Sequence, residues 1–190
     1  MKMKRLAVMT AAVAILTATA ARADDWLSSH FCYDSSKPLF NNNEFSIDAF
    51  GAYETQVHQR SGPIVNNFNR NGIWGGGLGL TYFSKYLGIG GESAAFSGTH
   101  NFFDYAGGNL YARLPIESLH MAPYIFGTGG RYFNPESNWY YGGGAGLEFR
   151  LTQKFGIFGD ARYEWRQINV FGDTGHFNIV EARVGARFIF

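Results

Sequence analysis

The feature that most constrains the fold is a two-residue alternation of charged and apolar side chains. The chain ends in VEARVGARFIF, where Glu181, Arg183 and Arg187 share one parity and apolar residues occupy the other. Successive side chains of a β-strand point to opposite faces, so such a segment has one charged face and one apolar face. The pattern predicts a strand whose two faces meet different environments.

Seven further segments alternate in the same way, which predicts an all-β chain. The expected strands are residues 45–57, 72–84, 87–97, 102–115, 121–133, 138–151, 155–167 and 177–190. A tilted membrane-spanning strand needs roughly 9–11 residues in the hydrocarbon layer, and these segments are long enough. The aromatic content (17%) favours strands, and the high glycine content (25 residues) counts against helices.

The expected connections differ in length at the two ends of the sheet. Residues 58–71 and 168–177 predict long loops, whereas residues 84–86 and 152–154 predict short turns at the opposite end. Outer-membrane barrels have short periplasmic turns and longer external loops. An even number of strands would then leave both termini on the periplasmic side.

The N-terminus predicts a cleaved signal peptide, residues 1–23. Lys2, Lys4 and Arg5 precede a mostly apolar run, and Ala21-Arg22-Ala23 matches a signal peptidase site. A membrane-anchoring helix is the alternative, but the run is short of the roughly 20 apolar residues that a span needs. We expect residues 24–43 to form a periplasmic leader segment and residues 44–190 to form the barrel.

Charge and cysteine content exclude two other classes of protein. Four of the 16 basic residues lie in the expected signal peptide, so no basic stripe remains that would indicate nucleic acid binding. The lone Cys32 gives no disulfide framework. It lies beyond the expected cleavage site and follows polar residues, so we do not expect it to carry a lipid anchor.

The charged faces of the strands predict an enclosed ion-pair network. Its expected members are Asp48, Glu54, Glu92, Arg113, Arg131, Glu148, Arg150, Asp160, Arg162, Glu164, Arg166, Glu181, Arg183 and Arg187. Every base among them is arginine, whose planar fork suits buried pairing with carboxylates. Lysine occurs after the signal peptide only at Lys37, Lys85 and Lys154, outside the strands, whereas a solvated outer face would mix both bases.

A soluble, lipocalin-like barrel with an apolar interior is the alternative to a membrane barrel. Glycines that recur at period two on the charged face, as at 75, 77 and 79 or 142, 144 and 146, argue against it, because they make room inside a narrow barrel. Large aromatic residues near strand ends also predict a girdle at the membrane interfaces. Its expected members are Trp74, Tyr82, Tyr124, Tyr132, Trp139, Phe155, Tyr163 and Trp165.

Asp104 departs from this pattern, because its parity places it on the expected lipid-facing side with Leu110. Two outcomes stay open. The carboxylate could lie near the external rim, where the cost of a charge is small. Alternatively, a bulge at Gly107-Gly108 could turn it inward.

Residues 45–190 resemble the small eight-stranded outer-membrane barrel family typified by the OmpA transmembrane domain, OmpX and the opacity-type surface proteins. The resemblance implies an eight-stranded antiparallel up-and-down transmembrane β-barrel in a Gram-negative outer membrane. Phe188 and Phe190 resemble the C-terminal assembly signal that the barrel assembly machinery recognises. Members of this family act in envelope integrity, adhesion and host interaction, and the resemblance carries no catalytic site.

We therefore expect a non-enzymatic outer-membrane protein without a cofactor or metal. Its expected partners are outer-membrane lipid and lipopolysaccharide, the assembly machinery and a surface ligand of the external loops. A narrow channel for small solutes is the first alternative, and a lipid-modifying enzyme is the second. The histidines, among them His58, His100 and His176, all lie outside the expected strands, which favours neither an enzyme nor a metal site.

Overall fold

The computed structural model of the 190-residue chain describes residues 34–60, 72–97, 103–133, 137–170 and 173–190. The expected signal peptide, Cys32 and His100 lie outside the described residues. Within the described ranges, no helix is long and apolar enough to cross a membrane.

Eight strands form a closed barrel in which each strand pairs with its neighbours in the sequence. They are β1 (Asn42–Arg60), β2 (Ile73–Ser84), β3 (Leu87–Phe96), β4 (Tyr105–Arg113), β5 (Met121–Tyr132), β6 (Asn138–Arg150), β7 (Phe155–Val170) and β8 (Asp173–Ile189). All pairs are antiparallel, and β8 closes the barrel against β1. The expected all-β, eight-stranded, up-and-down barrel is confirmed.

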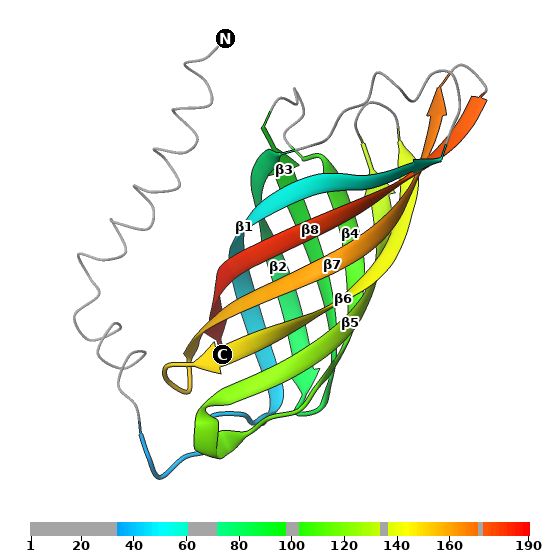
Figure 1. Ribbon diagram of the computed structural model, residues 1–190. Coiled ribbons are helices and arrows are strands. Elements are labelled where there is room, and N and C mark those ends of the chain that lie inside the picture. Colours follow the sequence, from blue (N-terminus) through cyan, green and yellow to red (C-terminus); the bar gives the residue numbers. More distant parts are fainter. Residues whose placement is uncertain (1–33, 61–71, 98–102, 134–136, 171–172) are drawn as a thin grey trace.

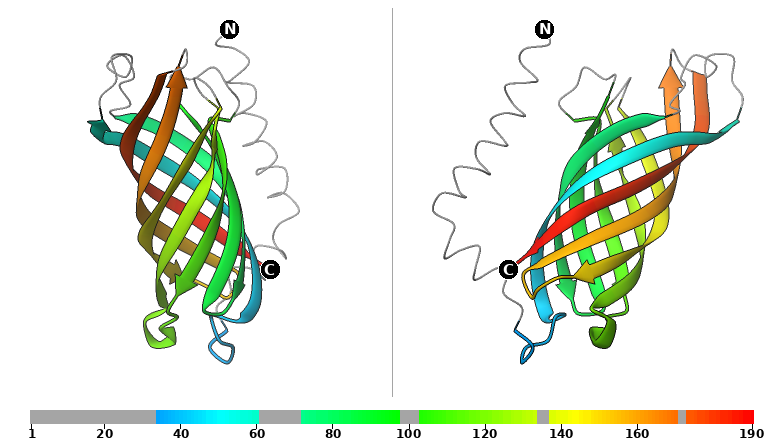
Figure 2. Two further views of the ribbon diagram at one scale, coloured as in Figure 1. Left: turned by 90° about the vertical axis from the view of Figure 1, so that its right-hand side faces the viewer. Right: turned by 60° about the vertical axis from the view of Figure 1, so that its left-hand side comes forward.

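The strands wind around the barrel at a steep tilt, and the two ends of the cylinder differ (Figures 1 and 2). At one end, the β7–β8 hairpin projects beyond the other strands, and we call this the hairpin end (Figure 1). At the other end, β2 and β3 join through a short turn, and the short 3-10 helix η2 (Glu117–Leu119) lies between β4 and β5. We call it the short-turn end; β1 begins there and β8 ends there.

The β7–β8 hairpin corrects one expectation from the sequence. Residues 168–177 predict a long loop, but the strands stay paired there through Ile168 with Gly175 and Val170 with Asp173. β1 likewise runs on to Arg60, which pairs with His176. Glycine and aspartate are poor strand formers, but the cross-strand pairing continues through them, because β-propensity depends strongly on context.

The barrel is inverted relative to a soluble protein, with charged and aromatic side chains inside and aliphatic side chains outside. The outward Leu110 and Val184 keep 67% and 69% of their surface exposed, whereas no inward arginine exceeds 5%. Aromatic rings fill much of the lumen: Phe50, Phe83, Phe96, Tyr105, Tyr111, Tyr124, Phe126, Tyr132, Tyr140 and Phe158.

Inward glycines provide the space that these rings occupy. A Cβ atom on Gly185 would lie 2.7 Å from the Phe158 ring, and one on Gly77 would lie 2.6 Å from the Phe50 ring. Gly185 is the register partner of both Phe50 and Phe158. The inward glycines, which recur at every second position, therefore leave room for aromatic rings from neighbouring strands. This is how a narrow barrel accommodates large side chains.

Candidate functional site

The lumen contains most of the charged side chains that the sequence assigns to it. The structure buries Asp48, Glu54, Glu92, Arg113, Glu148, Arg150, Asp160, Arg162, Glu164, Arg166, Glu181, Arg183 and Arg187. It adds one residue that sequence reasoning missed, Glu44, which is 3% exposed. Glu44 lies one residue before the expected first strand and shares the parity of Asp48, so extending that strand would have found it.

The first of two ion-pair networks lies toward the short-turn end, and we call it the lower network. It consists of Glu44, Asp48, Glu148, Arg113, Arg150 and Arg187. The Glu44 carboxylate accepts hydrogen bonds from Arg113 at 2.6 Å and from Arg150 at 2.7 Å. Glu148 accepts from Arg187 Nη1 at 2.6 Å and also pairs with Arg150. Carboxylates and guanidinium groups are equal in number here, so the lower network is neutral.

The second set, which we call the upper network, lies toward the hairpin end. It consists of Glu54, Glu92, Asp160, Glu164, Glu181, Arg162, Arg166 and Arg183. Arg183 binds both oxygens of Asp160, at 2.7 and 2.9 Å. Arg166 bridges Glu54 at 2.5 Å and Glu164 at 2.6 Å. Among the described residues, every ion pair of the lumen lies within one network or the other.

The upper network has more carboxylates than guanidinium groups, and neutral donors supplement its hydrogen bonding. Tyr124 donates to Asp160 at 2.7 Å, and Tyr132 donates to Glu54 at 2.6 Å. Asn109 donates to Glu92 at 2.8 Å. Buried carboxylates need such partners because burial without them costs several kcal/mol. The hydroxyl and amide donors therefore provide hydrogen bonds where guanidinium groups are fewer than the carboxylates.

Aromatic rings and a small cavity separate the two networks. The Arg187 guanidinium lies over the Phe83 and Phe158 rings, at 5.3 and 5.2 Å from their centroids. The Arg183 guanidinium lies 5.0 Å from the Phe50 centroid. The cavity between them has a volume of about 10 Å³, which is room for about one water molecule. Side chains thus fill the cross-section at this level.

Strand β5 faces the opposite way from the expectation. Arg131, expected in the lumen, is exposed on the outer wall, and its guanidinium lies 4.7 Å from the Trp139 ring centroid. Tyr124 and Tyr132, expected in the girdle, are 4% exposed and point inward. A tyrosine fits the lumen because its hydroxyl reaches a carboxylate there. The sequence-based prediction chose the inward face of β5 from the charge of Arg131. Arg131 lies near the strand end, however, where a long charged side chain on the outer wall can reach the interface.

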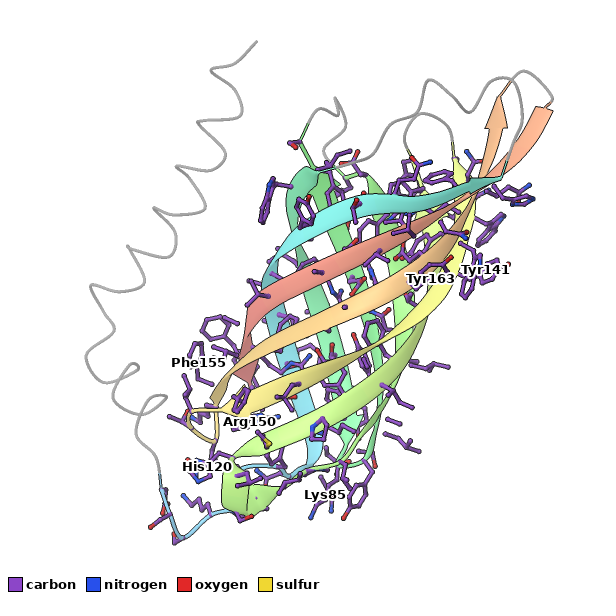
Figure 3. All side chains as sticks on the ribbon, in the orientation of Figure 1. Lys85, His120, Tyr141, Arg150, Phe155 and Tyr163 are labelled. Carbon is purple, nitrogen blue, oxygen red and sulfur yellow. The ribbon has the colours of Figure 1, made fainter. Side chains whose placement is uncertain are left out.

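The other expected girdle residues lie on the outer wall. Trp74, Tyr82, Trp139 and Trp165 are 66%, 41%, 59% and 43% exposed, and Phe155 and Tyr163 are partly exposed. Tyr163 lies outside the wall toward the hairpin end, as does Tyr141, which the sequence reasoning left out; Phe155 lies toward the other end (Figure 3). The outer wall therefore carries aromatic residues at two levels.

Ring contacts reinforce both aromatic levels. Toward the hairpin end, Tyr141 stacks on Trp165 with centroids 5.5 Å apart. Toward the short-turn end, Phe155 contacts Phe188 at 5.2 Å, and the terminal Phe190 lies 6.5 Å from Phe45. The two phenylalanines of the expected assembly signal thus lie on the outer wall beside the seam between β1 and β8.

Asp104 takes neither of the two expected positions. It is fully buried, and its carboxylate accepts a hydrogen bond from the backbone amide of Phe96. Its own backbone bonds to Ala94 and Phe133. The register of β4 is continuous through Gly107, so no bulge turns the strand there. Asp104 precedes β4, and the strand alternation does not apply to it.

The last residues of the expected leader cover the short-turn end of the lumen. Leu39 and Phe40 are 2% and 1% exposed. The Glu117 carboxylate accepts hydrogen bonds from their backbone amides, at 3.0 and 3.3 Å. The Phe40 ring lies 4.8 Å from the Arg150 guanidinium. The segment thus packs directly on the lower network and is hydrogen-bonded to η2, the short helix that precedes β5.

In the part of the chain that the structure describes, no group of three or more histidine, cysteine, aspartate or glutamate residues is arranged to hold a metal ion. His176 is exposed on β8 and pairs in register with Gln167.

Comparisons with known proteins give the fold. No family model matches the sequence, and no curated protein matches it. Neisserial surface protein A has a TM-score of 0.53 and 12% identity; the alignment covers 78% of this chain and 97% of that chain. OprH from Pseudomonas aeruginosa follows with a TM-score of 0.48, 17% identity and coverages of 78% and 99%. OprG from the same organism has a TM-score of 0.40, 12% identity and coverages of 81% and 99%. The closed eight-stranded barrel, together with the similarity to Neisserial surface protein A, gives this protein the fold of the small eight-stranded outer-membrane β-barrels.

Proposed function

We propose that this protein is an integral β-barrel of a bacterial outer membrane, exported by residues 1–23. In this proposal the hairpin end is external and the short-turn end is periplasmic. Outer-membrane lipid and lipopolysaccharide surround it, and the barrel assembly machinery inserts it.

The observation that carries this proposal is the inverted polarity of the wall. Leu78, Leu110 and Val184 are each more than 60% exposed, whereas six arginines are buried. In water such a wall would forfeit roughly 25 cal/mol for every Å² of apolar surface left exposed. In lipid it costs nothing, and aromatic residues at two levels match the two interfaces of a bilayer.

We further propose a structural or surface-interacting role rather than transport through the lumen. The two ion-pair networks and the aromatic rings between them occupy the middle of the lumen, and the cavity between them has room for about one water molecule. An eight-stranded barrel is narrow enough for side chains to fill it. The external loops are then the part of the protein available to a ligand.

The experiment is fractionation of the expressing cells, followed by SDS gel electrophoresis with and without boiling. We expect the protein in the outer membrane and a faster-migrating band without heating, because a closed barrel resists SDS. A soluble periplasmic protein without a heat shift would instead favour the lipocalin-like alternative and overturn the proposal.

Two further measurements separate the alternative functions. A narrow channel would give stepwise conductance in planar bilayers, increased by Glu148→Ala, which removes the centre of the lower network. A lipid-modifying enzyme would change the mass of lipid A on expression. We expect no conductance steps from the native protein and an unchanged lipid A mass.

A further inference from the structure

One strand arginine, Arg131, lies outside the lumen, and no carboxylate among the described residues pairs with it. Among strand residues whose exposure the structure describes, Arg131 is the one aspartate, glutamate, lysine or arginine on the outward face. Its guanidinium contacts the Trp139 ring at 4.7 Å, and none of the described ion pairs includes it. The other six strand arginines in this set are buried and paired, so Arg131 requires a separate explanation.

Arg131 lies within the aromatic level near the hairpin end. It pairs in register with Trp139 across β5 and β6. Two residues further along β6, Tyr141 is 64% exposed and stacks on Trp165. Aromatic residues at this position in a membrane barrel lie at the depth of the lipid headgroups. Arg131 is therefore held at the level where lipid phosphates would lie.

We propose that Arg131, supported by Trp139, binds a phosphate group of a phosphorylated glycolipid in the outer leaflet. This inference rests on the proposed membrane location and orientation. The guanidinium fork matches two phosphate oxygens and keeps its charge at any physiological pH. Stacking on Trp139 fixes the plane of the fork and so lowers the entropy that binding would cost.

The wall next to Arg131 favours a lipid over a free phosphate ion. On the same outward face of β5, Gly129 and Gly127 lie next to Arg131 in the direction of the short-turn end. Gly108 of β4 is the register partner of Gly129. A Cβ on Gly129 would have no neighbour closer than 3.6 Å, so packing of the barrel does not require glycine there. Leu110 and Ile125, which are 67% and 64% exposed, lie on the side of these glycines that faces the short-turn end. An acyl chain can lie in contact with the wall directly below a phosphate held by Arg131.

The test uses the refolded full-length barrel in detergent, after its heat shift on SDS gels has been verified. Native mass spectrometry would measure retention of lipid A bearing two phosphates. The variants are Arg131→Ala and Arg131→Lys. The matched control is Trp74→Ala, which removes an exposed aromatic residue of the same level from β2, where the described residues place no outward cation beside it.

We expect Arg131→Ala to reduce retention of lipid A roughly tenfold, as loss of hydrogen bonds to a charged group does. Arg131→Lys should keep part of the binding, because it preserves the charge without the fork. Trp74→Ala should retain lipid A as the native protein does. Dephosphorylated lipid A should bind the native protein and Arg131→Ala equally.

Equal retention by the native protein and Arg131→Ala would overturn the inference. So would complete displacement of lipid A by millimolar inorganic phosphate, since that would indicate a site for a free anion. These results differ from a failure of the proposed function, which would appear earlier as the absence of a heat shift. A heat-modifiable barrel whose lipid binding ignores Arg131 would leave the membrane location intact.

Discussion

Arg187 on the last strand binds both carboxylate oxygens of Asp48 on the first strand, each at 2.8 Å. The two residues are register partners, so this contact crosses the seam where the barrel closes. Both side chains are almost completely buried. The seam is therefore held by a charged pair in addition to the backbone hydrogen bonds.

Breaking this pair should destabilise the barrel more than removing both charges. Asp48→Asn leaves Arg187 with Glu148 alone and should lower the free energy of unfolding by about 3–5 kcal/mol. The double variant Asp48→Asn with Arg187→Gln should cost less than the sum of the single changes, because neither charge is stranded. Urea titration of the refolded barrel, followed by the heat-shifted gel band, measures all three variants. Additive losses would mean that the two charges are not coupled.

The unequal charge of the two networks predicts different costs for the same substitution. Glu148→Gln removes a carboxylate from the neutral lower network, where Arg150 and Arg187 both bind it. We expect a loss of about 3–5 kcal/mol in the free energy of unfolding. Glu181→Gln removes one carboxylate from a network that has more carboxylates than guanidinium groups, so we expect a change within about 1 kcal/mol or a small gain. The same urea titration compares the two variants. Equal losses of unfolding free energy would mean that the charge balance of the two networks does not decide the cost of removing a carboxylate.

The packing of aromatic rings against inward glycines gives a prediction that has a control in the same barrel. A Cβ on Gly185 would contact the Phe158 ring and the rigid backbone oxygen of Ala49. Gly185→Ala should therefore destabilise the barrel by about 1–3 kcal/mol through overpacking. A Cβ on Gly51 would have nothing within 4 Å, so Gly51→Ala should be neutral or slightly stabilising. The measurement is the temperature at which each variant loses its fast-migrating gel band. Equal temperatures for the two variants would mean that Gly185 is not needed to make room for the Phe158 ring.

Glu117 is expected to hold the leader segment against the short-turn end. Glu117→Ala removes the acceptor of the Leu39 and Phe40 amides and should accelerate their hydrogen exchange roughly tenfold. Amides in the middle of β2 should exchange as before. The matched control is Lys154→Ala, an exposed change in the turn between β6 and β7. Exchange at Leu39 and Phe40 that is unchanged by Glu117→Ala would mean that packing alone holds the segment.

The alternation of the sequence was sufficient to predict the number, order and direction of the strands. It also placed most of the lumen charges, because an arginine or glutamate in the middle of a membrane-spanning strand has one energetically acceptable side. That argument weakens near strand ends, where Arg131 can lie at an interface and still face outward. It also fails for tyrosine, since Tyr124 and Tyr132 have apolar rings and hydroxyl groups that suit either side.

Other features depend on contacts that a local pattern does not contain. Asp104 binds the backbone amide of Phe96, a partner contributed by the neighbouring strand. The pairing of β7 with β8 continues through residues whose local propensity predicts a loop. The division of the charges into two networks likewise results from the register between strands, which fixes the level at which each side chain enters the lumen.

The order of the charges along the chain has a consequence for assembly. β1 and β3 contribute the carboxylates Glu44, Asp48, Glu54 and Glu92, and the inward arginines among the residues whose burial the structure describes all come from β4 or later. An unfinished sheet made of the early strands would therefore carry a concave surface of like charge, which repels itself and retains water. The later strands bring the opposite charge, and the seam brings Arg187 to Asp48 last in chain order. Closing the barrel would then remove the repulsion among the early carboxylates, so the interior charges favour the complete barrel over a sheet of the early strands alone.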